Sequence, residues 1–314
     1  MRVLVAGATG VIGRPLTRRL QAAGHDVVGL TRHPDGARRL RDGGVEGVVA
    51  DVLDRGGLLR ALDGLRADAV VHEGTALSRA PMRHRDLYPT DRLRTRGTAN
   101  LLAAARQVGA RRFVTQSFLY VYGFTDHGER PVSEDAPLGP AGGARFDVHV
   151  AAMRANERHV LTAPGLEGVA LRYGFFYGPE PGTYGLLDMA ARRVLPAPRV
   201  GTWMSALHVE DAAAATVAAL ERGRPGRAYN VADDHPLTWT AYLDALAEAA
   251  GAPRPWRVPD AALRLSPYLG GLMTRASIRL DTSKAKRELG WAPSYRSVRE
   301  GLPSVGTAWR ESRR

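Results

Sequence analysis

The chain has 314 residues, of which 44% are hydrophobic and 24% are charged, as in globular proteins built from one large domain or from a large and a smaller one. It contains no cysteine, which excludes disulfides, thiolate nucleophiles and cysteine-ligated metal sites, and no metal site is expected. It has no run of about 18 apolar residues, and "MRVLVAGATG" is typical of a first β-strand rather than a secretion signal, so we expect a cytoplasmic protein without membrane association.

The formal net charge is +12, and all but two of the 44 basic residues are arginines. The arginines are scattered and are not interleaved with aromatic residues in a tract, so we do not expect nucleic-acid binding. The two lysines are Lys284 and Lys286. No mechanism can therefore use a lysine in the N-terminal two-thirds of the chain.

Short β-branched runs alternate with helical stretches through the first half of the chain, which predicts an α/β fold of the Rossmann type with a doubly wound parallel sheet. The expected strands and representative helices, in chain order, are Val3–Ala6, Ile12–Ala23, Val27–Leu30, Gly47–Ala50, Ala69–His72, Thr98–Val108, Arg112–Thr115 and Val169–Tyr173. The pattern becomes irregular after Tyr177. We expect an NAD(P)-binding domain over residues 1–172, to which 205–232 returns, and a smaller C-terminal substrate-binding lobe over residues 173–314.

The first strand is followed by "GATGVIG", with Gly7, Gly10 and Gly13 in the spacing GxxGxxG. The first glycine allows a tight turn, the second lets the backbone approach a pyrophosphate, and the third permits close packing of helix on strand. The helix N-terminus presents free N–H groups to the phosphates. We expect Thr9, Val11 and Ile12 to contact the cofactor together with these glycines.

The second strand ends in Thr31 and Arg32, where NAD-selective folds commonly carry an acidic residue for the ribose 2′-hydroxyl. Arg32 can pair with a 2′-phosphate, which favours NADP(H) and leaves NAD(H) as the alternative. Asp51 follows the third strand and, with Val52, is placed to meet the adenine.

Nine segments in order, namely "GATGVIG", "ADVLD", "VVHEGTA", "RGTANLLAAA", "RFVTQSFLYVYG", "LRYGFFYGPEPG", "SALHVEDAAAA", "AYNVAD" and "DTSKAKRELGWAP", resemble an extended short-chain dehydrogenase/reductase of the NAD-dependent epimerase/dehydratase family. The resemblance implies seven parallel strands, a site in the cleft below a C-terminal lobe, and a homodimer formed through helices around Thr98–Val108 and Val150–Leu161. It also implies cofactor contacts from the following residues: Gly74, Thr75, Met153, Tyr173 and Phe175.

Catalysis in this family rests on a Ser or Thr, a Tyr and a Lys. Alignment on "VYG" puts the Ser/Thr position at Phe118, with Ser117 one residue away. Alignment on Glu157 puts His149 at the tyrosine position and Met153 at the lysine position.

A shift of one residue would give Val150 and Arg154, and no shift restores the triad because residues 123 to 172 contain neither tyrosine nor lysine. The chain is therefore an atypical member by this resemblance. Two interpretations stay open. Either His149 supplies a proton in place of tyrosine, since imidazole titrates near neutrality, or it is a bystander and Met153 fills the volume of the lysine. The candidate proton donors are His149, Ser117, Tyr173 and the substrate itself.

Other departures from the family concern the substrate. Tyr173 and Phe175 stand where Pro and Asn are usual, and "MSALHVED" lacks the arginine that sugar-nucleotide members often carry before this element. With Phe118, Phe176 and Trp203, they predict an aromatic pocket suited to a flat hydrophobic ligand. In the same element, we expect His208 and Asp211 to anchor the start of a helix.

Three functions follow from these patterns. The first is an NADPH-dependent ketoreductase of a bulky aromatic or polyketide-type ketone in natural-product (antibiotic) biosynthesis, in which the cofactor supplies the hydride and the substrate assists proton transfer. The second is a non-catalytic NADP(H)-binding sensor of the kind related to fungal nitrogen regulators. The third is a sugar-nucleotide epimerase or dehydratase, which the missing tyrosine and lysine disfavour.

Overall fold

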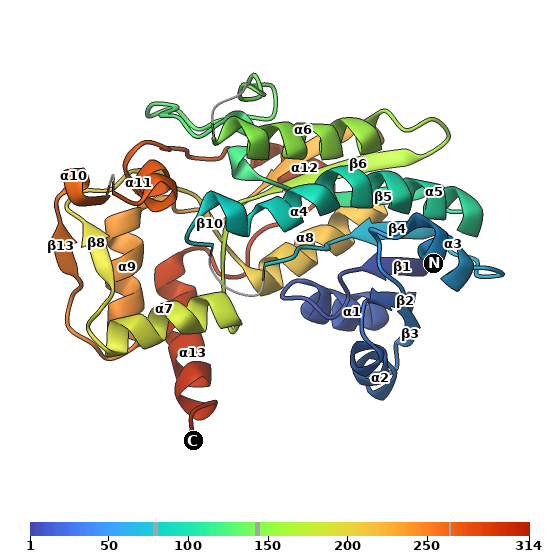
Figure 1. Ribbon diagram of the computed structural model, residues 1–314, viewed down its shortest axis with the longest axis horizontal. Helices are drawn as coiled ribbons and strands as arrows, with labels where there is room; N and C mark the ends of the chain where they lie inside the picture. Colours follow the sequence, from blue (N-terminus) through green and yellow to red (C-terminus); the bar gives the residue numbers. More distant parts are fainter. Residues whose placement is uncertain (78–80, 142–144, 264) are drawn as a thin grey trace.

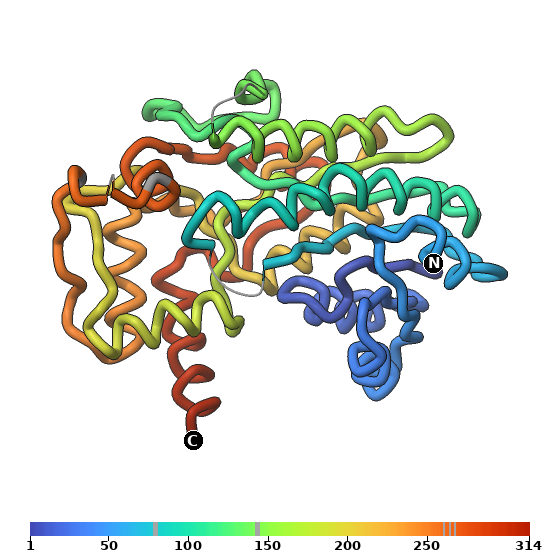
Figure 2. Tube along the Cα trace, in the orientation of Figure 1, coloured from blue at the N-terminus to red at the C-terminus, as the bar shows by residue number. Residues whose placement is uncertain are grey.

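A computed structural model describes residues 1–77, 81–141, 145–263 and 265–314 (Figures 1 and 2). Seven strands form one sheet on the right of the view, and a smaller lobe of helices and short strands lies on the left (Figure 1). In spatial order the strands are β11 (Arg227–Val231), β6 (Glu167–Tyr173), β5 (Arg112–Phe118), β4 (Ala69–His72), β1 (Arg2–Ala6), β2 (Asp26–Thr31) and β3 (Glu46–Val49). Every neighbouring pair in this sheet is parallel, which confirms the predicted doubly wound fold.

Helices cover both faces of the sheet, because its central strands are buried on both sides. Along β1, Val3 and Val5 pack in one apolar layer, and Leu4 and Ala6 pack in the opposite one. The first layer is covered by α1 (Gly13–Ala22), α2 (Pro34–Asp42), α8 (Val209–Arg222) and α12 (Ser283–Leu289). The opposite layer is covered by α3 (Arg55–Ala61), α5 (Thr98–Val108) and α6 (Asp147–Leu161).

Two segments lie beyond the carboxyl ends of the strands. The one before α5 consists of η1 (His84–Asp86), α4 (Tyr88–Arg92) and η2 (Leu93–Gly97), and the one after β5 is η3 (Leu119–Tyr122). Since α4, η2 and α5 follow one another without a break, they carry the chain from this edge back along the face of the sheet.

The smaller lobe has its own apolar core, in which Trp239, Tyr242, Leu302 and Trp309 are buried. Its elements are β7 (Phe175–Tyr177), α7 (Pro181–Ala191), β8 (Pro196–Pro198), β9 (Trp203–Met204), β10 (Ala206–His208), β12 (Leu237–Thr238), α9 (Trp239–Ala249), β13 (Trp256–Val258), α10 (Asp260–Leu263), α11 (Pro267–Thr274) and α13 (Val298–Glu311). The last helix runs away from this lobe to the C-terminus (Figure 2).

The chain passes between the seven-stranded sheet and the smaller lobe more than once. The predicted boundary at residue 172 falls at the end of β6, and residues 205–232 span β10, α8 and β11, of which β11 joins the large sheet. Further on, α12 packs against α8 and β11. The division into two domains at 172 stays a prediction.

Buried polar contacts fix the position of α6 on the sheet. The side-chain oxygen of Asn156 accepts hydrogen bonds from the hydroxyls of Thr98 at 2.7 Å and Thr115 at 3.0 Å. The next residue, Glu157, binds the guanidinium of Arg172 on β6 through both carboxylate oxygens, at 2.9 and 2.7 Å. Both members of this ion pair are almost fully buried, with side-chain exposures of 6% for Arg172 and 3% for Glu157.

We predict that Glu157→Gln destabilises the fold by about 3–5 kcal/mol, because it leaves the buried Arg172 charge without its carboxylate. Urea unfolding followed by circular dichroism measures the loss. The matched control is Glu167→Gln, whose partner is Arg112 and whose side chain is 54% exposed. It should cost less than about 1 kcal/mol. Equal effects of the two substitutions would contradict the role assigned to the buried pair.

Candidate functional site

The glycine-rich turn after β1 is shaped to receive a diphosphate. Gly7 has φ +90°, and a Cβ there would lie 2.7 Å from the backbone of Glu73, so only glycine fits. A Cβ at Gly13 would overlap the carbonyl oxygen of Gly7. In this described segment, the amides of Val11, Ile12 and Gly13 make no hydrogen bond within the protein. Free N–H groups at a helix start are the groups that bind phosphate oxygens.

The rest of the turn is held by its own contacts. The Gly10 amide donates to the Gly7 carbonyl at 2.8 Å, and Arg14 donates from Nε to the Thr9 carbonyl at 3.1 Å. The family cofactor, a nicotinamide dinucleotide, therefore fits the residues present at this position.

The residues predicted to meet the adenosine half stand at the ends of β2 and β3. Arg32 is exposed and makes no hydrogen bond or ion pair with any described residue, so its guanidinium is available to a ligand. The Asp51 side chain is exposed and accepts from the Leu53 amide at 2.9 Å. The Val52 carbonyl accepts from Asn100 at 2.8 Å, which ties this loop to α5.

Gly74 and Thr75 follow β4 beside the glycine turn. The Gly74 amide donates to His72 Nδ1 at 3.2 Å, its carbonyl accepts from Gln116 at 3.2 Å, and Thr75 is exposed. Burial lowers the pKa of His72 to about 4, so this imidazole is a neutral acceptor. The loop is thus held by neutral hydrogen bonds next to Gly7.

Sequence reasoning missed Glu73, which is buried beneath the same turn. Its Oε1 accepts from the Tyr173 hydroxyl at 2.9 Å, and Thr216 lies 2.7 Å from that hydroxyl. Burial raises the pKa of Glu73 to about 8, and the hydrogen bonds from Tyr173 and Thr216 offset this only in part. Tyr173 itself has no exposed surface, and burial raises its pKa well above the usual range. A side chain without exposed surface cannot reach a substrate or cofactor, so the structure does not support the predicted roles of Tyr173 as proton donor and cofactor contact.

The two residues at the tyrosine and lysine positions of α6 have different surroundings. His149 is buried, with Nδ1 2.6 Å from Asp91 Oδ2 and Nε2 3.0 Å from Nδ1 of His84. Met153 is buried in the apolar core that α6 shares with the smaller lobe. His149 therefore belongs to a polar line of three side chains, whereas Met153 fills apolar space.

Ser117 and Phe118 end β5 beside α6. Because side chains alternate along a strand, Ser117 points to the same face as Thr115, which contacts α6. The Ser117 hydroxyl is buried and has no partner among the described residues. The Phe118 ring is half-buried on the other side and lies 6.3 Å from the ring of Phe175 and 6.1 Å from that of Phe176.

The predicted aromatic cluster forms only in part. Trp203 makes no ring contact with Phe118, Phe175 or Phe176 among the described residues; the Arg279 guanidinium lies 4.1 Å from the centre of its indole ring. The Nδ1 of His208 accepts from the Glu210 amide at the start of α8, as predicted. In contrast, the carboxylate of Asp211 binds the amides of residues 294 and 295 rather than its own helix start.

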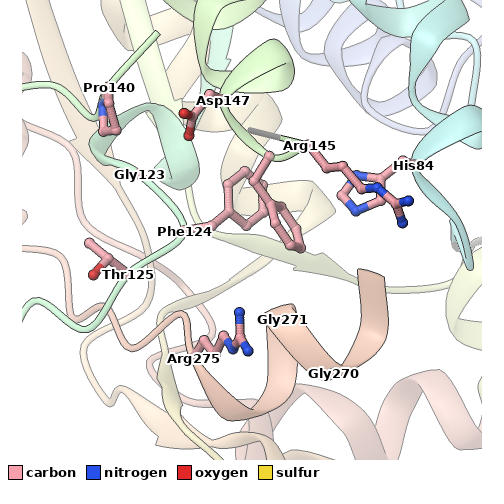
Figure 3. Close-up of a pocket in the computed structure, with 11 residues that line it drawn as sticks. His84, Gly123, Phe124, Thr125, Pro140, Arg145, Asp147, Gly270, Gly271 and Arg275 are labelled. Atoms are coloured by element: carbon pink, nitrogen blue, oxygen red, sulfur yellow. The ribbon is translucent and has the colours of Figure 1, made fainter. Parts of the chain in front are cut away.

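A pocket of about 480 Å³ opens between the N-terminus of α6, the loop after η3 and α11 (Figure 3). Its wall includes Phe124 and Phe146, whose ring centres are 4.2 Å apart. His84 packs edge-on against Phe146 at 4.5 Å. Arg145 lies beside His84 on one side, and Arg275 lies below Phe124 on the other (Figure 3). The pocket is therefore aromatic, and its wall carries two guanidinium groups and the carboxylate of Asp147.

Rings connect this pocket with the end of β5. Phe118 lies 5.5 Å from Tyr120, and Tyr120 stacks on Phe124 at 4.4 Å. Sequence reasoning identified Phe118 but missed Phe124, Phe146 and His84, because no motif marks them and only the tertiary structure brings them together. No group of three or more His, Asp or Glu side chains within the described ranges is arranged to hold a metal ion. No helix in that same part of the chain is long and apolar enough to cross a bilayer.

A profile of the NAD dependent epimerase/dehydratase family matches residues 3–232. The chain belongs to this family. The match runs from the first strand through β11, so it includes the glycine turn and α6. The resemblance inferred from the nine sequence segments is thereby confirmed.

Several relatives are named as reductases. A "3-diazoavenalumate denitrifying reductase" from a Streptomyces species is 42% identical over 96% of this chain and 99% of its own length. A "4-hydroxy-2-methyl-3-oxo-4-farnesyl-3,4-dihydroquinoline-1-oxide ketoreductase" from Stigmatella aurantiaca is 28% identical over 93% of this chain and 92% of its own. The chain is accordingly an NAD(P)-dependent oxidoreductase, which argues against the non-catalytic sensor.

Solved structures agree with the fold. The UDP-glucose 4-epimerase of Thermus thermophilus, determined in complex with NAD, superposes with a TM-score of 0.79 over 99% of both chains at 28% identity. That enzyme binds a nicotinamide dinucleotide, in accord with the free amides of the glycine turn described above.

We predict that Gly13→Ala lowers the affinity for NADPH at least about tenfold, because the added methyl group would displace the Gly7 carbonyl and deform the turn. Fluorescence titration measures the affinity, and circular dichroism verifies the fold. The matched control, Gly185→Ala in α7, has open space around its Cβ and should leave binding unchanged. A folded Gly13→Ala protein with normal affinity would refute the assignment of the turn.

Proposed function

We propose that this protein is an NADPH-dependent reductase of a flat aromatic natural product, with an arene diazo group as the hydride acceptor. The single observation that carries the proposal is α6, which has His149 and Met153, both buried, where the family places an acid–base tyrosine and its lysine. The cofactor, when bound, supplies the hydride.

The choice of acceptor rests on the relative named for a diazo compound, and the absence of tyrosine and lysine from α6 is consistent with it. Epimerisation and dehydration of sugars begin with removal of a hydroxyl proton, so they need a base beside the cofactor. A diazonium group accepts hydride at its terminal nitrogen without receiving a proton in the same step. Such a reaction suits a helix without tyrosine or lysine, and the 42% identical relative is named for a diazo compound and for its denitrification.

The reaction balances without an additional reductant. Hydride from NADPH forms an N–H bond on the terminal nitrogen, which converts the diazonium to an aryl diazene and leaves NADP⁺. Loss of the N–H proton and cleavage of the carbon–nitrogen bond release N₂ and leave an electron pair on the ring carbon. That carbon takes up a proton, so the net change is replacement of the diazo group by hydrogen.

The pocket beside α6 supports an aromatic substrate. Its volume of about 480 Å³ falls in the ordinary range for small-molecule sites. Phe124 and Phe146 offer ring faces for stacking, and Arg145 and Arg275 offer positive charge for a phenolate or carboxylate on the same molecule.

Reduction of an aromatic ketone is the second candidate, and the Stigmatella relative named as a ketoreductase favours it. It would use the same cofactor turn and the same pocket. It differs in the proton requirement, because the alkoxide formed by hydride transfer must be protonated by the protein, by solvent or by a neighbouring substrate hydroxyl.

For the cofactor, we predict that Arg32→Ala weakens NADPH binding about tenfold and leaves NADH binding unchanged, because only NADPH carries the 2′-phosphate that Arg32 would meet. Titration of each variant with both cofactors measures the effect. Arg41→Ala, an exposed arginine at the other end of α2, is the matched control for loss of one positive charge. Equal losses for NADPH and NADH would contradict the preference for NADP(H).

For the substrate, we predict one ¹⁵N₂ released for each NADPH oxidised when the enzyme receives a ¹⁵N-labelled arene with a diazo group beside a phenol oxygen. Gas mass spectrometry and absorbance at the nicotinamide band measure both quantities. With an aromatic ketone and 4-deuterated NADPH, deuterium on the carbinol carbon would instead favour the second candidate. Absence of NADPH oxidation with both substrate classes would overturn the proposed function.

A further inference from the structure

Three side chains from three elements form one hydrogen-bonded line at the edge of the pocket. Asp91 comes from α4, His149 from α6 and His84 from η1. The distances along the line are 2.6 Å from Asp91 Oδ2 to His149 Nδ1 and 3.0 Å from His149 Nε2 to His84 Nδ1. The two imidazole rings are nearly parallel, at an interplanar angle of 9°.

The order of partners determines where the protons lie. A carboxylate only accepts, so His149 carries its proton on Nδ1 and has a lone pair on Nε2. His84 must then donate from Nδ1, which leaves the lone pair on its Nε2. Arg94 lies 3.4 Å from the other oxygen of Asp91, so positive charge balances the carboxylate end of the line.

The free end of the line lies in the wall of the pocket. His84 lines the pocket, and its Nε2 is buried without a hydrogen-bond partner in the described part of the chain. Phe146 at 4.5 Å and Tyr268 at 5.5 Å hold the ring edge-on from two sides. The ring is therefore fixed with a lone pair unused by the protein.

We propose that Asp91, His149 and His84 form a proton relay in which His84 Nε2 is the catalytic base and acid that touches the substrate. His149 and Asp91 are positioning residues that set the tautomer of His84. This role revises the sequence-based choice of His149, which reaches the pocket only through His84.

The relay supplies the proton steps that hydride transfer leaves open, and to that extent it rests on the proposed function. His84 Nε2 removes the N–H proton of the aryl diazene, and the carbon–nitrogen bond breaks as N₂ departs. The same Nε2–H then protonates the ring carbon, so His84 returns to its neutral form. On a ketone, a protonated His84 would give its proton to the alkoxide and recover one from solvent.

The surroundings favour a neutral His84 as the resting form. Burial lowers the pKa of His84, with smaller contributions in the same direction from His149 and Arg145. Among the described residues, Asp147 and Arg275 line the same pocket, the Tyr268 ring on α11 contacts His84, and Asp86 lies on the same short helix. Because the base form is required, activity should be present above this pKa and should be lost as the pH falls through it.

The first arm of the test is kinetic. His84→Gln should lower kcat about 10²- to 10⁴-fold with unchanged NADPH affinity, and it should remove the acidic limb of the pH profile. His149→Gln and Asp91→Asn should lower kcat less and shift that limb. The matched control is His159→Gln at the opposite end of α6, which should behave as the unchanged protein. If His84→Gln keeps the normal rate and acidic limb, the relay is refuted.

The second arm needs no turnover. In ¹⁵N-histidine NMR of the full chain, His84 and His149 should both be Nδ1–H tautomers, although free histidine prefers Nε2–H, and His149→Gln should release His84 from that state. The aromatic anion 4-hydroxycinnamate should shift the His84 Nε2 resonance. An Nε2–H tautomer at His84, or no shift with this probe, would overturn the relay. The predicted tautomers and shift without any reduction would instead leave the relay standing and reject the proposed substrates.

Discussion

The attachment of α6 to the sheet is the constraint on which the rest of the site depends. Asn156 and Glu157 bind β5 and β6 through buried polar contacts, and such contacts tolerate little displacement. His149 lies seven residues earlier, so at a rise of about 1.5 Å per residue it stands about 10 Å further along the helix. This places its ring beyond the carboxyl ends of the strands, where Asp91 and His84 meet it.

The two halves of the site are built in different ways. The dinucleotide turn is made by backbone, with Gly7 required by its positive φ and by the closeness of β4. The pocket proposed for the substrate is lined by residues from η1, the loop after η3, the start of α6 and α11. Backbone geometry keeps the cofactor common to the family, whereas side chains allow the substrate to change.

Two buried carboxyl groups have different partners and therefore different charge states. Glu157 is paired with Arg172 and contributes to the attachment of α6. Glu73 has only hydroxyl partners, so burial raises its pKa and favours the neutral acid. The hydroxyl of Tyr173 donates to this carboxyl group, so it is already engaged within the protein.

The sequence by itself determined the parallel sheet, the glycine turn and the lack of tyrosine and lysine between residues 123 and 172, because each is a local pattern or a plain fact of composition. It also located the helix that carries His149. Only the tertiary structure decided which groups His149 contacts, since Asp91 lies 58 residues away and His84 lies 65 residues away. It likewise decided that Tyr173 is occupied, by a carboxyl group 100 residues away. Hydrophobic periodicity predicts which residues are buried, but it does not predict which buried polar groups will meet, because that depends on how separate elements pack.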